Sequence, residues 1–122
     1  MTFPSHPQRP GRVEVELPVV LEVSGEAFGG VARNIGIGGM FVAADRVSRI
    51  GDEILLSFSI PEEAERVSVR GEVRWVRDTF VSERGDAPGM GIRFLDLETE
   101  EAIALAGFIR RVGAAVRSPN GA

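Results

Sequence analysis

The feature that most constrains the fold is an alternation of apolar and mostly polar side chains. In the segment 13–23 every odd position is apolar, and the same two-residue period recurs over 53–60 and 67–75. An extended strand points successive side chains to opposite faces, so each of these segments is expected to bury one face. In the last segment this register places Trp75 among the inward-facing residues, and we expect its ring to lie in the core.

Three shorter segments, 27–34, 40–43 and 89–96, are also typical of strands, and glycine-rich or polar turns separate them from their neighbours. Pro18 lies in the middle of the first strand. Because proline lacks a backbone N–H, it indicates a bulge or an edge position there.

Only the end of the chain has a helical period. Thr99 is the expected N-cap, and two glutamates follow it in the first turn, where the helix dipole favours anions. Arg110, Arg111 and Gly113 mark the expected end of the helix. The apolar side chains that are expected to pack onto the strands recur at helical spacing and are Leu105, Phe108, Ile109 and Val112.

These patterns predict an all-β fold, a small antiparallel six-stranded β-barrel with one C-terminal α-helix. We divide the 122 residues into a flexible arm (1–12), one barrel domain with its helix (13–116) and a frayed tail (117–122). The length suits one hydrophobic core, and we find no internal repeat that would indicate a second domain.

The composition excludes several kinds of chemistry. There is no cysteine, and the single histidine, His6, lies in the proline-rich arm, so we expect no metal site and no Ser–His or Cys–His nucleophile. No segment has the roughly 20 apolar residues of a membrane span, and the first residues lack the apolar core of a signal peptide. We therefore expect a cytoplasmic binding protein that is not an enzyme and does not insert into membranes.

The distribution of the charges along the chain is more informative than the net charge. The formal net charge of −4 argues against a general nucleic-acid binder, although a few local arginines suffice for a small anion. Arg66, Arg70 and Arg74 alternate with apolar residues and form a basic stripe on the outside of the predicted barrel. This stripe is either an ordinary solvated face or a contact surface.

Two segments carry the functional information. The first is Asn34-Ile-Gly-Ile-Gly-Gly-Met-Phe-Val42, in which Gly36, Gly38 and Gly39 require positive φ or close approach of another group. It is either a tight β connection or a platform on which a flat ring or a phosphate lies against the backbone.

The second segment is Gln8-Arg-Pro-Gly-Arg12, immediately before the first strand. Arginines in a flexible arm are commonly just solvated. Arg9 and Arg12 are alternatively placed to fold over a bound anion, because guanidinium groups donate paired hydrogen bonds to phosphate or to the edge of guanine.

Together the two segments resemble the PilZ family of bacterial cyclic di-GMP receptors, which carry an Arg-x-x-x-Arg arm and an Asp/Asn-x-Ser-x-x-Gly motif. The resemblance covers about residues 8–112 and includes the Gly51-Asp52 turn, the segment 71–76 and the segment 89–97. It implies a barrel with a C-terminal helix, cyclic di-GMP as the ligand and a partner protein that receives the signal. The ligand-binding residues it implies are Arg12, Asn34 and Gly39, with Arg9, Gly36 and Gly38 as further members of the site.

The chain departs from the family pattern at two positions. Gln8 stands where the first arginine is expected, and Gly36 stands where the serine is expected. Two functions therefore remain open: a receptor that binds cyclic di-GMP and relays it to a partner protein, or a module that binds no nucleotide and acts as a constitutive protein–protein adaptor in motility or secretion regulation.

Overall fold

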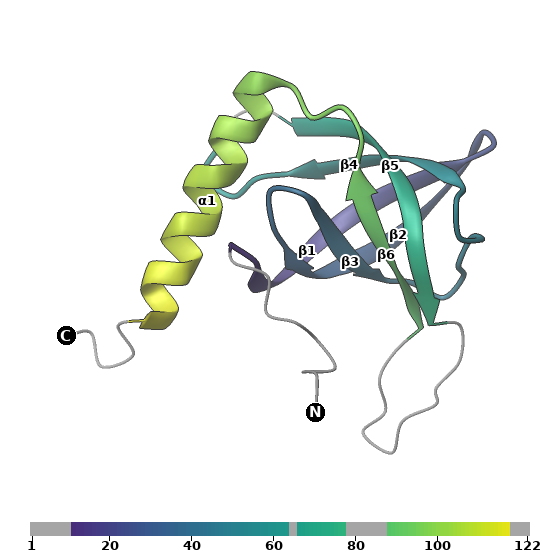
Figure 1. Ribbon diagram of the computed structural model, residues 1–122, viewed down its shortest axis with the longest axis horizontal. Helices are drawn as coiled ribbons and strands as arrows, with labels where there is room; N and C mark the ends of the chain where they lie inside the picture. The colour runs from purple at the N-terminus through teal and green to yellow at the C-terminus, as the bar shows by residue number, and fades with distance from the viewer. Residues whose placement is uncertain (1–10, 64–65, 78–87, 118–122) are drawn as a thin grey trace, which may run out of the picture.

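A computed structural model describes residues 11–63, 66–77 and 88–117 (Figure 1). Six strands in this part of the chain form a closed barrel in the order β1-β2-β3-β6-β5-β4, in which every neighbouring pair is antiparallel. The barrel and the helix that follows it confirm the predicted fold class. The elements are β1 (Val13–Val23), β2 (Glu26–Ile35), β3 (Gly39–Ala43), β4 (Glu53–Ser59), β5 (Arg66–Arg77), β6 (Gly89–Phe94) and α1 (Thr99–Arg117).

The core fills the inside of the barrel with the side chains that the alternation selects. In β4, for example, Ile54, Leu56 and Phe58 are buried, while Glu53 and Leu55 are exposed. The described residues include no buried polar or charged side chain. Burial of apolar area is therefore the main source of stability for this barrel.

Pro18 lies in β1 close to an irregularity in the pairing with β2. The register shifts between Glu14 and Leu17, directly before the proline. Because the described strands close into a barrel, β1 has neighbours on both sides and is not an edge. Of the two expectations for Pro18, an irregular pairing nearby is the one observed.

The prediction that Trp75 lies in the core is wrong. In β5 the pairing with β6 shifts between Val73 and Trp75, so that one extra residue, Arg74, is inserted into the strand. A bulge of this kind reverses which face the following residues occupy. Trp75 accordingly points outward and is 44% exposed, and Val76 takes the place against the core.

The helix begins differently from the prediction. The N–H of Ala102 donates to the backbone oxygen of Glu98 (2.8 Å), and the N–H of Glu98 donates to Oε1 of Glu101 (3.2 Å). This reciprocal arrangement identifies Glu98 as the N-cap, so the assignment of that role to Thr99 is wrong.

The helix also continues past Gly113 to Arg117, so the expected end at Arg110–Gly113 is wrong. A glycine in a helix interior costs only about 1 kcal/mol, which the strong helix formers that follow it help to offset. The apolar face is confirmed: Leu105, Phe108 and Ile109 are buried and Val112 packs against the core. Near the far end of the helix, a Cβ at residue 113 would lie 3.8 Å from Cγ1 of Val13 in β1.

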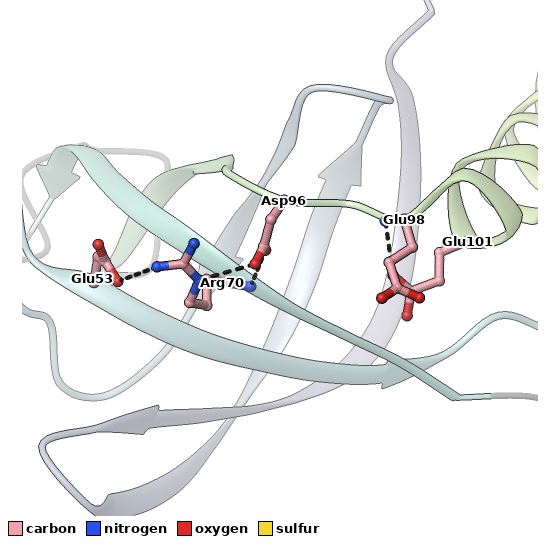
Figure 2. A network of polar contacts seen from close by, with 5 residues as sticks. All are labelled: Glu53, Arg70, Asp96, Glu98 and Glu101. Atoms are coloured by element: carbon pink, nitrogen blue, oxygen red, sulfur yellow. Dashed lines mark hydrogen bonds and ion pairs between the residues drawn. The ribbon is translucent and has the colours of Figure 1, made fainter.

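A network of polar contacts fixes the start of the helix to the barrel (Figure 2). Arg70 donates from Nε to Oδ2 of Asp96 (2.9 Å) and from Nη1 to Oε1 of Glu53 (3.2 Å), and its backbone N–H donates to Oδ1 of Asp96 (3.1 Å). One turn into the helix, Oε2 of Glu101 accepts from the N–H of Ser68 (3.3 Å). These contacts tie β4, β5 and the segment before α1 together.

The other arginines of the predicted basic stripe are also bonded to the barrel's own acceptors. Arg66 donates to the hydroxyls of Ser57 and Ser59, and Arg74 donates to Glu72. The stripe is exposed, but Arg70 and Arg74 pair with carboxylates of neighbouring residues, and Arg66 donates hydrogen bonds to two hydroxyl groups.

The Arg70 network predicts an acid-sensitive contribution to stability. Hydrogen bonds from the side chain and then the backbone of Arg70 lower the pKa of Asp96 below its usual value. A carboxylate with a lowered folded-state pKa stabilises the protein above its usual pKa of about 4, and the contribution disappears as the pH falls through the lowered value. Between pH 7 and about pH 2.5, we expect the free energy of unfolding to fall less in Asp96→Asn than in wild type. Urea unfolding at both pH values measures the change in the free energy of unfolding. Asp45→Asn is the control. An equal loss of stability in wild type and Asp96→Asn would contradict the prediction.

Candidate ligand-binding site

Arg12, at the end of the arm, contacts the strand that precedes the glycine-rich turn. Nε of Arg12 donates to Oδ1 of Asn34 at 3.2 Å, and Nη2 of Arg12 donates to the same oxygen. The pairing of Val13 with Ile35 places Arg12 beside Gly36. The chain thus brings together two polar side chains that are 22 positions apart in the sequence.

Gly36 is buried because the arm lies directly on it. A Cβ at residue 36 would come within 2.9 Å of Cγ of Arg12 and 3.3 Å of the backbone oxygen of Gly11. Such distances require a neighbour to move, so the absent side chain is what allows the arm to occupy this position. The place where the family pattern has a serine is filled here by the aliphatic stem of Arg12.

The turn itself spans Gly36 to Gly39, whose backbone N–H and oxygen form a 2.8 Å hydrogen bond. A Cβ at Gly39 would lie 2.1 Å from the backbone oxygen of Ile92 in β6, whereas a Cβ at Gly38 would meet nothing within 4 Å. None of the turn's three glycines has positive φ, so that alternative is wrong, and close approach is confirmed for Gly36 and Gly39.

An aromatic pair extends the same surface across the sheet. Asn34 pairs with Phe41, Phe41 pairs with Gly91, and Gly91 pairs with Trp75, so these residues form one row across four strands. Directly paired residues lie on the same face of a sheet, here the outer face of the barrel. The Trp75 ring lies over Gly91, where a Cβ would come within 2.1 Å of Nε1, and it stacks on Phe41 with centroids 5.0 Å apart.

This row adds a residue that reasoning from the sequence missed. Alternation assigns Trp75 to the core, and only the bulge in β5 turns it outward. Arg77 also lies over Phe41, with its Cζ 4.9 Å from the ring centroid. The exposed indole is therefore held in place by a ring beneath it and by the glycine that gives it room.

We name Arg12, Asn34, Gly36, Gly38 and Gly39 the arm site. The structure brings all five together at one end of β2, while Arg9 and Gln8 lie outside the described residues. The arrangement is an open shelf that offers guanidinium donors, an amide, exposed backbone at Gly38 and, along the row, an aromatic ring. Such a surface can bind a flat anionic ligand, and none of its groups is a nucleophile or a general base.

The described part of the chain has further surface features outside the arm site. Two hollows, of about 580 and 220 Å³, lie beside α1 and beside the β1–β2 turn, away from the arm site. Where the chain is described, no group of three or more histidine, cysteine, aspartate or glutamate side chains is placed to hold a metal ion. Nor does α1 combine the length and apolarity needed to span a membrane.

The solved structures that resemble this chain share its barrel. The MotI/DgrA inhibitor of motility from Bacillus subtilis has a TM-score of 0.75 and 22% identity over 88% of this chain, which covers 52% of that protein. The YcgR PilZ domain with c-di-GMP from Escherichia coli has a TM-score of 0.69 and 10% identity over 93% of this chain and 98% of that domain. PlzA of Borreliella burgdorferi in complex with c-di-GMP has a TM-score of 0.61 and 14% identity, covering 84% of this chain and 41% of that one.

The chain therefore spans about half the length of MotI/DgrA and less of PlzA. At these identities the similarity shows the fold alone. No curated protein sequence matches the chain. The family model described as PilZ domain, however, matches residues 7–111, which is most of the sequence. The chain belongs to the PilZ domain family.

Proposed function

We propose that this PilZ domain binds cyclic di-GMP at the arm site and relays the binding to a partner protein. The observation that carries the proposal is the contact of Arg12 with Asn34, which joins the arm to the β2–β3 turn on the outer face of the barrel. The YcgR domain and PlzA, which have the same fold, are both described with c-di-GMP.

The groups at the site suit the chemistry of a cyclic dinucleotide. The guanidinium of Arg12 carries several N–H donors in one plane, which match a phosphate or the O6 and N7 atoms of guanine. The amide of Asn34 supplies both a donor and an acceptor. The exposed face of Trp75 supplies a surface for a base, and stacking of a base on an aromatic ring is worth about 1–3 kcal/mol.

The resting contacts of the site weaken the expected affinity. Nε and Nη2 of Arg12 already donate to Asn34, so a phosphate that takes these donors replaces an existing bond and the net gain is smaller than the new bond itself gives. Gly36 contributes no hydroxyl, and the stem of Arg12 lies where one would project. A neutral hydrogen bond of this kind is worth roughly 0.5–1.5 kcal/mol.

The same contacts favour a second candidate function. Because Arg12 is already held by Asn34 and packed on Gly36, the end of the arm has a defined position without any ligand. A module of this kind is suited to act as a constitutive protein–protein adaptor. Affinity for cyclic di-GMP separates the two functions.

Titration with cyclic di-GMP tests the proposal directly. Trp75 is the only tryptophan, so a base that stacks on it will change the protein's intrinsic fluorescence in proportion to binding. We expect Trp75→Leu to bind about 5-fold to 150-fold more weakly in calorimetry, the equivalent of the stacking free energy. Leu55→Ala, an exposed apolar position in β4, is the control and should bind as wild type does. If ligand concentrations up to about 1 mM, which correspond to a binding free energy of ~4 kcal/mol, produce no heat and no fluorescence change, the receptor function is contradicted and the adaptor function is favoured.

A further inference from the structure

We propose that two copies of this chain associate through the outer face of α1, with the two helices antiparallel. We define this outer face as Glu100, Ile103, Gly107 and Arg110. At about 100° per residue, all four lie within about 40° of the direction opposite Leu105, which is buried against the barrel. The face is therefore turned away from the buried side of the helix and lies open to a hollow that it shares with barrel residues such as Ile60 and Val67.

The outer face carries a projection and a recess one helical turn apart. Ile103 is 67% exposed, although the other large apolar side chains among the described residues of its helix are buried or partly buried. Gly107 presents no side chain, and the nearest groups to a Cβ there would be the guanidinium nitrogens of Arg111 at 3.5 Å and Arg110 at 4.0 Å. An isoleucine beside a glycine gap, edged by flexible arginines, is a shape that another helix can match.

The positions of these residues are symmetric about Leu105. A twofold axis beside that position brings Ile103 of each copy over Gly107 of the partner subunit. The same axis brings Glu100 of each copy beside Arg110 of the partner subunit, since both pairs are centred on residue 105. An interface between identical surfaces requires this kind of self-complementarity.

The charges support a second copy as the occupant. Neither Glu100 nor Arg110 forms an ion pair with another described residue. In the antiparallel pair each acidic end of the face meets a basic end, and the two helix dipoles also oppose each other. A parallel pair would instead place like charges together.

The surroundings of the helix leave room for this contact. Figure 1 shows α1 along one end of the barrel. The outer face borders the hollow of about 580 Å³, whose opposite wall includes Ile60 and Val67. One pair of helices is a small contact compared with the roughly 1,200 Å² or more of a stable interface, so we expect a reversible dimer with a dissociation constant on the order of 10–100 µM.

Analytical ultracentrifugation of the 122-residue chain from about 5 µM to 1 mM tests the proposal against the expected affinity range. Wild type should pass from monomer to dimer, and Ile103→Lys should weaken association at least about tenfold, because its ammonium group would be buried beside the guanidinium groups of Arg110 and Arg111 that edge Gly107. The matched control is Ile50→Lys. Ile50 is also 67% exposed, but it precedes β4, and all residues that line the hollow beside α1 follow the end of β4.

A charge-exchange experiment tests the antiparallel register. Glu100→Arg alone places two arginines together at both ends of the dimer, and Arg110→Glu alone places two glutamates together, so each variant should remain monomeric. Mixing the two variants pairs each new charge with its opposite and should restore association to within about threefold of wild type. Circular dichroism confirms that each variant is folded. Wild type that stays monomeric at 1 mM, Ile103→Lys that dimerises as well as wild type, or a mixture that gains no association would overturn the proposal.

Discussion

Replacing Arg12 by alanine is expected to weaken the binding of cyclic di-GMP at least about 100-fold, because each hydrogen bond to a charged group is worth roughly 1.5–3 kcal/mol and the guanidinium can form two. The loss should appear as an affinity too weak to measure by calorimetry. The barrel should remain folded, since the residue precedes β1 and its side chain is not part of the core. All titrations should use the same low salt concentration, because salt screens contacts with phosphate.

The control for Arg12 is Arg33→Ala. Arg33 lies next to Asn34 in β2, its side chain is half exposed, and it pairs with Glu16 at 3.1 Å. This variant loses the same charge close to the site, and its affinity should stay within about twofold of wild type, as expected for a screened surface charge. Equal affinities for wild type and Arg12→Ala would remove Arg12 from the site.

A second large effect is expected within the glycine-rich turn, where neighbouring glycines have different roles. Gly39→Ala should lower the free energy of unfolding by about 3 kcal/mol or more, because its Cβ would lie 2.1 Å from the backbone oxygen of Ile92 and must push β3 away from β6. Gly38→Ala should change it by less than about 0.5 kcal/mol, because nothing lies within 4 Å of the new methyl group.

Urea unfolding of the two alanine variants beside wild type measures the difference. The comparison is well matched, because the residues are adjacent and the substitution is the same. If both variants have the stability of wild type, the close approach of β6 to Gly39 is not rigid, and the role assigned to that glycine is wrong. A folded Gly38→Ala protein can then be titrated to learn whether the ligand needs the open backbone at that position.

The strands could be predicted because their burial follows one local rule. Alternation over β1, β4 and most of β5 selects the side chains that fill the barrel, and helical spacing selects the buried face of α1. Trp75 shows where the rule fails. A bulge depends on how two strands twist against each other, and a single strand's sequence carries no period that reveals it.

The candidate site was predictable in its members but not in its contacts. The sequence motifs point to Arg12, Asn34 and the three glycines, and the structure places these residues together. The sequence motif ends at Gly39, but it does not show how the contacts of Gly39 differ from those of Gly38, because the difference lies in the backbone of a strand more than fifty positions away. The choice of Glu98 over Thr99 as the N-cap likewise follows from the tertiary contact of Glu101 with Ser68.

The helix α1 connects the polar network around Arg70 with the end of the arm. Its first turn is pinned by the contacts around Arg70 and Glu101, whereas its far end, at Gly113, abuts Val13, the residue that directly follows Arg12. The two points are roughly 20 Å apart along the helix axis. Between them Leu105, Phe108 and Ile109 are buried against the barrel, so the helix is also held along its middle. Arg12 and the far end of α1 are therefore joined through the single residue Val13, although they are far apart in the sequence.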